Sequence, residues 1–96
     1  KAGVVNFTRS VAIELGPHQI QVNGIAPTYI QTNLTDLLKG ESEESRRFLA
    51  AIAERTPLGR VGQPDDVKGV AVFLASPASD LMTGHTVAVD GGWLAW

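Results

Sequence analysis

The sequence contains no cysteine, and only 6% of its residues are aromatic. Without cysteine, neither disulfide bonds nor thiolate metal ligands are possible. Eight basic and ten acidic residues give a net charge of −2, which offers no positive footprint for nucleic acid or anionic lipid. No apolar run reaches the roughly 20 residues that span a bilayer. The composition predicts a cytoplasmic protein with no nucleic-acid partner and no membrane span.

The 96 residues allow one domain at most, with a thin core. The hydrophobic fraction of 44% and the charged fraction of 19% are typical of a globular chain. The first residue is not methionine, and a helical pattern begins at once. We therefore expect residues 1–96 to be one segment of a longer protein.

Hydrophobic spacing predicts a helix over Ala2–Leu15 and two strands. The apolar face of this helix consists of Val4, Thr8, Val11 and Leu15, with Val5 and Ala12 alongside. Gly16 followed by Pro17 predicts a left-handed cap and a helix stop. The apolar run Ile20–Ala26 is typical of a strand covered on both faces, as in a parallel sheet, and Thr86–Val89 predicts a last strand.

A further helix is predicted to begin at Pro64, with Asp65 and Asp66 in its first turn. Its expected buried stripe consists of Val67, Val70, Ala71 and Leu74. Residues 33–63 are interpreted as a lid-like substrate insert, two short helices joined by the polar residues 39–45. The resulting order predicts an α/β fold, the C-terminal portion of a Rossmann-type doubly wound parallel sheet.

The loop Pro27–Thr32 follows the first predicted strand. In open α/β sheets, ligands bind outside the carboxyl ends of the strands. A stiff loop with hydroxyl groups at that position is a candidate cofactor contact. The alternative is an ordinary strand-to-helix turn, because proline stiffens loops and Thr32 or Asn33 can cap a following helix.

Five blocks in this order resemble the C-terminal part of the short-chain dehydrogenases/reductases. They are Lys1–Gly3, Glu14–Pro17, Pro27–Thr32, Pro57–Pro64 and Thr83–Gly92. The resemblance covers essentially the whole chain. It implies NAD or NADP as the cofactor and reversible hydride transfer between the nicotinamide and a small-molecule secondary alcohol or ketone.

The resemblance also implies roles for individual residues. Lys1 matches the lysine that stands four positions after the catalytic tyrosine, binds the nicotinamide ribose and lowers the pKa of that tyrosine. Pro27 would pack on the ring, while the backbone of Ile30 and the hydroxyl of Thr32 would bind the carboxamide. Thr28 stands where the family usually has glycine, which narrows the space beside the ring. For Lys1, the alternative is a solvated residue at a helix start.

Other residues of these blocks are interpreted as structural. The segments 55–60 and 62–67 would reverse the chain before the last helix. Gln21 stands where the family often has arginine, so one internal ion pair is expected to be missing. Gly91 and Gly92 would allow turns and the close approach of another backbone.

The last four residues include Trp93 and Trp96. Two such rings predict burial at a subunit contact or over a substrate pocket, or else packing against their own chain. The resemblance implies a homotetramer that pairs through the last strand and the preceding helix. His18 and His85 lack metal-like spacing, so no metal is expected.

The predicted function is part of an NAD(P)-dependent oxidoreductase that acts on a polyol, sugar or sugar acid. Within the family, a 3-oxoacyl-(acyl-carrier) reductase is the alternative. Outside it, the alternative is a non-catalytic fragment or interaction module. The chain contains neither the catalytic tyrosine and serine nor the glycine-rich phosphate loop, so it is expected to be inactive alone.

Overall fold

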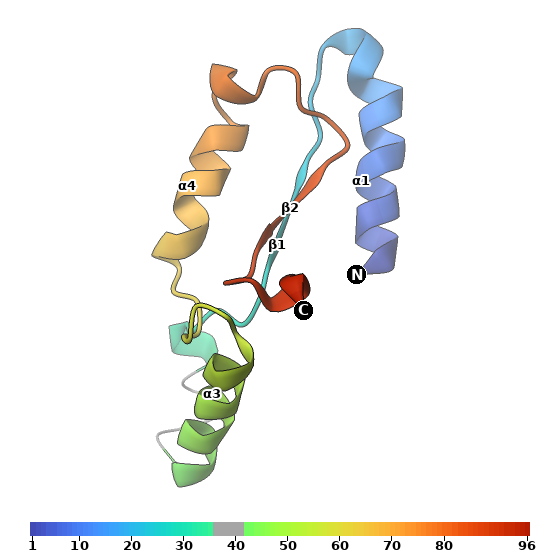
Figure 1. The fold of residues 1–96 in the computed structure, drawn as a ribbon. Coiled ribbons are helices and arrows are strands. Elements are labelled where there is room, and N and C mark those ends of the chain that lie inside the picture. The colour runs from blue at the N-terminus through green and yellow to red at the C-terminus, as the bar shows by residue number, and fades with distance from the viewer. Residues whose placement is uncertain (36–41) are drawn as a thin grey trace. The chain divides into compact units, whose positions relative to one another are not determined.

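The computed structural model describes residues 1–35 and 42–96 (Figure 1). The chain divides into two compact units, residues 1–26 with 68–88 and residues 27–67 with 89–96. Each unit is described by itself. Within the described ranges, no helix combines the length and the apolar character needed to cross a membrane.

Helix α1 spans Ala2–Leu15, as the hydrophobic spacing predicts. Its buried residues are Thr8 and Ala12, and the Thr8 hydroxyl donates to the Val4 carbonyl at 2.8 Å. The predicted apolar face is wrong at Val4, whose side chain is 67% exposed. Val5 is half-buried instead, although Val4 lies only about 40° from Thr8 around the helix, so packing and not helical spacing decides which of the two is covered.

The end of α1 also differs from the prediction. Gly16 is right-handed, with φ −52°, and begins the short 3₁₀ helix η1, Gly16–His18. The left-handed residue is Gln19, with φ 59°. Pro17 fits the first turn of η1 because no helical N–H bond is needed there. The glycine and proline therefore change the helix type, and Gln19 ends it.

Strands β1, Gly24–Pro27, and β2, Thr86–Val89, form a two-stranded sheet. The Gly24 amide donates to the His85 carbonyl at 2.8 Å and the Thr28 amide donates to the Val89 carbonyl at 3.3 Å. Both partners advance along the chain together, so the strands are parallel. β2 has its predicted bounds, whereas β1 begins four residues later than the predicted Ile20–Ala26 and includes Pro27, which was expected to open the loop.

The residues before β1 bond to the segment before β2 through side chains. The Gln21 amide donates to the Ser79 carbonyl at 2.9 Å, and the Asn23 amide donates to the Met82 carbonyl at 2.9 Å. Ser79 is only 1% exposed, and its hydroxyl donates to the carbonyls of Leu74 and Ser76. These side-chain hydrogen bonds accompany a backbone bond from the Gly84 amide to the Val22 carbonyl at 2.7 Å, and an amide stands where the family often has a guanidinium.

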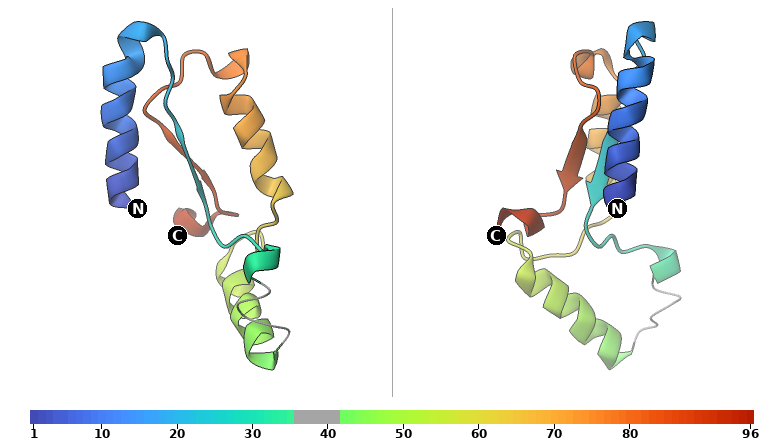
Figure 2. Two further views of the ribbon diagram at one scale, coloured as in Figure 1. Left: turned by 180° about the vertical axis from the view of Figure 1, so that it is seen from behind. Right: turned by 90° about the vertical axis from the view of Figure 1, so that its right-hand side faces the viewer.

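Helix α4 spans Asp65–Leu74 and begins one residue after Pro64, with both aspartates in its first turn as predicted. From residue 68 onward it lies on the opposite side of the strand pair from α1 (Figures 1 and 2). Helices on both faces of a parallel sheet are the arrangement of doubly wound α/β folds. The predicted stripe is wrong at Ala71, which is exposed, because Val67, Val70 and Leu74 form the half-buried face.

Gly69 in α4 offers a direct test of this helix. An added Cβ meets no heavy atom within 4 Å, and the residue is exposed. We expect Gly69→Ala to stabilise the fold by about 0.5–1 kcal/mol, because alanine loses less backbone entropy in a helix. Thermal unfolding followed by circular dichroism measures this. A lower melting temperature would contradict it and would indicate that another surface packs on Gly69.

In the second unit, helix α3 spans Glu43–Arg55. The Ser42 hydroxyl accepts from the Ser45 amide at 3.2 Å, which is a helix N-cap. The predicted polar joint over residues 39–45 is therefore wrong from Ser42 onward, because serine and the two glutamates after it start a helix. Residues 33–35 are also helical, and the part of the joint before residue 42 lies outside the described residues.

Candidate functional site

Two backbone pairings hold the loop Pro27–Thr32. At its start, the Thr28 amide donates to the Val89 carbonyl. Further along, Ile30 forms an isolated parallel bridge with Gly62. In this bridge the Gly62 amide donates to the Tyr29 carbonyl at 2.9 Å, and the Gln31 amide donates to the Gly62 carbonyl at 2.9 Å. The loop therefore continues β1 as extended, paired backbone.

This bridge decides where the backbone groups of Ile30 point. In a parallel bridge the flanking residues supply the hydrogen bonds, so the bridged residue directs its own N–H and C=O to the opposite side. Within residues 1–35 and 42–96, neither group of Ile30 has a hydrogen-bond partner. One donor and one acceptor side by side can bind a carboxamide, which carries the complementary acceptor and donor.

Thr32 caps the short helical stretch that follows the loop. Its amide donates to the Thr35 hydroxyl at 2.8 Å, and its own hydroxyl accepts from the Thr35 amide at 3.3 Å. The Thr35 hydroxyl in turn donates to the Thr32 carbonyl at 2.7 Å. The capping alternative drawn from the sequence is therefore correct. Among the described residues, the Thr32 hydroxyl proton has only the 3.4 Å contact to the Thr35 hydroxyl, so it can still donate to a ligand.

A cavity of about 140 Å³ adjoins the loop. Its walls are Thr28, Ile30, Leu58, Arg60, Gly62, Asp66, Val89 and Gly91. Thr28 is half-buried, whereas Pro27 is exposed. The cavity is smaller than the roughly 300–1,000 Å³ of a complete small-molecule site, so these residues provide a subsite.

Lys1 belongs to the first unit. Its side chain is exposed at the start of α1 and makes no capping hydrogen bond, while its carbonyl accepts from the Val5 amide at 3.1 Å. The structure therefore gathers the predicted residues 27, 28, 30 and 32 on one loop. It describes Lys1 separately, as a solvated ammonium at a helix N-terminus.

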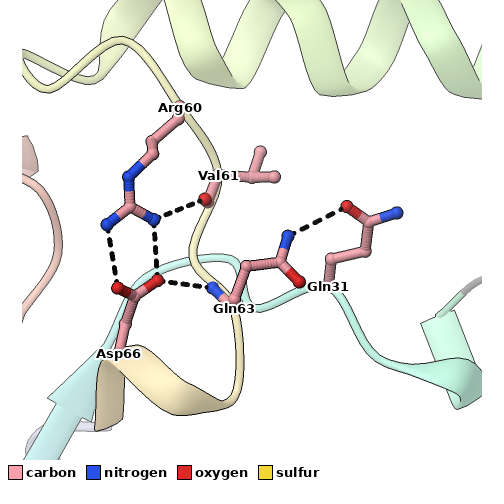
Figure 3. A network of polar contacts seen from close by, with 5 residues as sticks. All are labelled: Gln31, Arg60, Val61, Gln63 and Asp66. Carbon is pink, nitrogen blue, oxygen red and sulfur yellow. Dashed lines mark hydrogen bonds and ion pairs between the residues drawn. The ribbon is translucent and has the colours of Figure 1, made fainter.

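A polar network adjoins the Ile30 bridge (Figure 3). The Arg60 guanidinium donates to both carboxylate oxygens of Asp66, at 2.7 and 2.8 Å. The same carboxylate accepts from the Gln63 amide at 2.7 Å, and Arg60 also donates to the Val61 carbonyl at 3.3 Å. The Gln63 side-chain amide donates to the Gln31 side chain at 3.3 Å.

The hydrogen bonds from Arg60 and from the Gln63 amide hold the pKa of Asp66 well below its ordinary value. The same pair raises the pKa of Arg60. Because the Asp66 pKa is lowered on folding, its stabilising contribution is complete above the unfolded value of about 3.9. That contribution is lost as the pH falls further, through the folded pKa.

Sequence reasoning treated residues 60–66 as scaffold and missed their link to the loop. One signal was present, an acidic residue three positions after Gln63, as in a capping box. The pairing of Gly62 with Ile30 has no comparable signal, because it joins backbone groups of two separate segments.

The tryptophans at the end of the chain contact Arg55. Its guanidinium lies 4.8 Å from the ring centroid of Trp93, and the Trp96 indole N–H donates to the Arg55 carbonyl at 2.9 Å. Trp96 is 85% exposed, so its ring is not buried within this chain. The alternative in which a ring packs against its own chain therefore fits Trp93, whereas the Trp96 ring stays exposed in this chain.

Comparison with known proteins places this geometry in context. The family profile described as "Enoyl-(Acyl carrier protein) reductase" matches residues 1–94. A 2-dehydro-3-deoxy-D-gluconate 5-dehydrogenase of Dickeya dadantii is 50% identical over 95 residues, which are 99% of this chain and 36% of the relative. The chain thus spans about a third of the length of such relatives.

Solved structures give the same result. A putative NAD(P)-dependent gluconate 5-dehydrogenase from Beutenbergia cavernae, with bound NADP, superposes with a TM-score of 0.86 at 43% identity, covering 100% of this chain and 37% of that one. A short-chain type dehydrogenase/reductase from Mycobacterium marinum superposes with a TM-score of 0.81 at 42% identity, covering 97% and 34%.

Proposed function

The chain belongs to the short-chain dehydrogenase/reductase family, and from this premise we propose that the protein transfers hydride between NAD or NADP and a secondary alcohol or ketone. The observation that carries the proposal is the loop after β1, where Ile30 presents a backbone donor and acceptor with no hydrogen-bond partner among the described residues. The NADP bound in the Beutenbergia cavernae relative supports it.

In this proposal the loop residues hold the nicotinamide by its carboxamide. The Ile30 N–H donates to the carboxamide oxygen and the Ile30 carbonyl accepts from its NH₂ group. The Thr32 hydroxyl donates a further hydrogen bond, while Pro27 packs on the ring. When bound, the cofactor supplies the hydride acceptor at C4. The loop fixes which face of the ring meets the substrate, because three hydrogen bonds define one orientation.

Lys1 tunes the proton transfer. In alcohol oxidation, the hydroxyl proton of the substrate passes to a tyrosine phenolate as the carbon gives up its hydride. This chain does not contain that tyrosine, which the family resemblance places four positions before Lys1. The positive charge of Lys1 lowers the pKa of the phenol, so that the phenolate forms nearer neutral pH.

We infer that the substrate is a sugar acid or a related polyol or sugar. The named relatives act on gluconate derivatives. Thr28 adds a methyl and a hydroxyl group to the wall of the subsite, where glycine would leave open space. A narrower subsite with a hydroxyl group in its wall favours a compact polyhydroxylated substrate over a long acyl chain.

We further propose a cytoplasmic homotetramer that assembles through α4 and β2. The side chains of Val72 and Phe73 on α4 are 68% and 38% exposed, and a partner subunit would remove this apolar surface from water. Light scattering of the complete protein measures the assembly.

The test uses the complete protein in which this chain occurs. NAD and NADP are each offered with gluconate, 2-dehydro-3-deoxy-D-gluconate and a 3-oxoacyl thioester, and formation or loss of reduced nicotinamide is followed by absorbance. We expect turnover with a sugar acid. Turnover only with the thioester would favour the acyl-carrier reductase, and no binding of either cofactor would favour a non-catalytic module.

A further inference from the structure

We propose that the Arg60–Asp66 ion pair is a positioning device for the nicotinamide loop, acting through Gly62 on the backbone of Ile30. This inference rests on the proposed function, since it assigns to the pair the task of aiming the carboxamide-binding groups. Arg60 and Asp66 both line the cavity beside the loop, but in this scheme neither side chain contacts the cofactor. Both act through the backbone between them.

The pair closes a clamp around the segment that contains Gly62. One carboxylate oxygen of Asp66 accepts from Arg60 at 2.7 Å and also from the Gln63 amide at 2.7 Å, and the other oxygen accepts from Arg60 at 2.8 Å. Arg60 is additionally tied to the Val61 carbonyl. Arg60 and Gln63 are therefore both fixed to one carboxylate (Figure 3), and Gly62 lies between them in the sequence.

Gly62 needs such a clamp because it has no side chain to restrict its backbone. Glycine has more conformational freedom in the unfolded chain than any other residue, and it loses that freedom on pairing. An added Cβ would collide with Ile30 Cδ1, the far end of a flexible side chain, and lie 3.2 Å from the Tyr29 carbonyl oxygen, so glycine lets the two segments approach without a shift of that side chain. The close approach in the bridge thus places a conformationally free residue, Gly62, between the two segments. The Arg60–Asp66 clamp restricts its backbone.

The fixed Gly62 in turn orients Ile30. Its amide and carbonyl engage the groups on either side of Ile30, each at 2.9 Å, so the peptide planes flanking Ile30 cannot rotate without breaking a hydrogen bond. A second tie runs parallel to the bridge, from the Gln63 side-chain amide to the Gln31 side chain at 3.3 Å. Rotation of Gly62 would therefore turn the Ile30 donor and acceptor away from a bound carboxamide.

A purely structural role makes a different prediction. If the network only capped α4, the Asp66 carboxylate and the Gln63 amide would suffice, and Arg60 would add little beyond an ion pair with side chains 54% and 30% exposed. The positioning role requires Arg60, because its guanidinium fixes the other end of the segment. Substitutions of Arg60 therefore separate the two roles.

The experiment compares Arg60→Gln with Arg47→Gln in the complete protein. Arg47 pairs with Glu43 at 3.2 Å on the exposed face of α3, so the control removes the same kind of group from another ion pair. The readouts are the dissociation constants of NADH and NADPH, kcat, and hydrogen exchange of the Gly62 and Gln31 amides. All are measured below the melting temperature of each variant.

For Arg60→Gln we expect faster hydrogen exchange of both bridge amides. We also expect kcat to fall on the order of 10- to 100-fold, because displacing the reacting groups by up to about 1 Å has an effect of this size. Arg60→Lys, which keeps the charge but cannot bind both oxygens, should recover part of the loss. Arg47→Gln should leave the exchange of the two bridge amides unchanged.

An Arg60→Gln variant with unchanged kcat, cofactor affinity and amide exchange would overturn the inference, even if its melting temperature fell. Faster exchange with unchanged kcat and affinity would also overturn it, since the bridge would then not serve the cofactor. If the unsubstituted protein binds neither NADH nor NADPH, the proposed function itself fails and the inference falls with it. The unsubstituted protein therefore tells the two failures apart.

Discussion

Replacing Lys1 by methionine is expected to lower kcat for alcohol oxidation by about 10²- to 10⁴-fold in the complete protein. Methionine keeps much of the length and apolar character of the side chain but removes the ammonium. The phenol of the tyrosine four positions before Lys1 then loses a nearby positive charge, and the pKa of that phenol rises. Less phenolate is present near neutral pH, so proton transfer from the substrate slows.

The pH profile checks this explanation. Alcohol oxidation needs the phenolate, so the rate rises with pH through the pKa of the tyrosine. Since Lys1→Met raises that pKa, the rising limb of the profile should move to higher pH, and the rate at high pH should recover in part. Lys68→Met, a change to an exposed lysine of α4, serves as the control. Near-normal turnover by Lys1→Met at neutral pH would remove Lys1 from the mechanism.

The second large effect concerns stability. We expect Gly91→Ala to destabilise the fold by about 2–5 kcal/mol, from a left-handed backbone conformation and from overpacking. Gly91 has φ 63°, and an added Cβ would lie 2.6 Å from Thr56 Cγ2. Thr56 is only 3% exposed and its hydroxyl donates to the Ile52 carbonyl at 2.7 Å, so it has little room to move.

Gly59→Ala is the matched control for Gly91→Ala. Gly59 has a similar φ of 71°, but an added Cβ meets no heavy atom within 4 Å. It should cost only the conformational part, about 1–2 kcal/mol. Chemical denaturation of both variants gives the difference, which reports the contact with Thr56 alone. Equal losses in the free energy of unfolding would mean that the turn at Gly91 shifts to accommodate the added Cβ without strain.

The local elements could be predicted well from the sequence. α1 and β2 have their predicted bounds, and α4 begins one residue after the proline that was expected to start it. These elements follow from periodicity and from helix and strand signals that lie within a few residues of each other. The glycine turn after β2 is also local, with positive φ at both Gly91 and Gly92.

The predictions that were wrong concern which groups a segment meets. Val4 of α1 is exposed although it lies on the same helical face as the buried Thr8, because packing and not spacing decides which residues of that face are covered. Before β1 begins at Gly24, the side chains of Gln21 and Asn23 bond to the segment before β2, beside the backbone bond from Gly84 to Val22. In both cases several arrangements satisfy the same local pattern, and the packed neighbours choose among them.

The sequence by itself determined the family, the parallel α/β order and the loop that is the candidate cofactor contact, since each follows from the identity and spacing of nearby residues. The tertiary structure decided that Gly62 pairs with Ile30 and that one carboxylate holds both Arg60 and the Gln63 amide. The physical reason is that backbone N–H and C=O groups are the same in every residue apart from proline. Their partners are therefore set by which segments the fold brings within hydrogen-bonding distance.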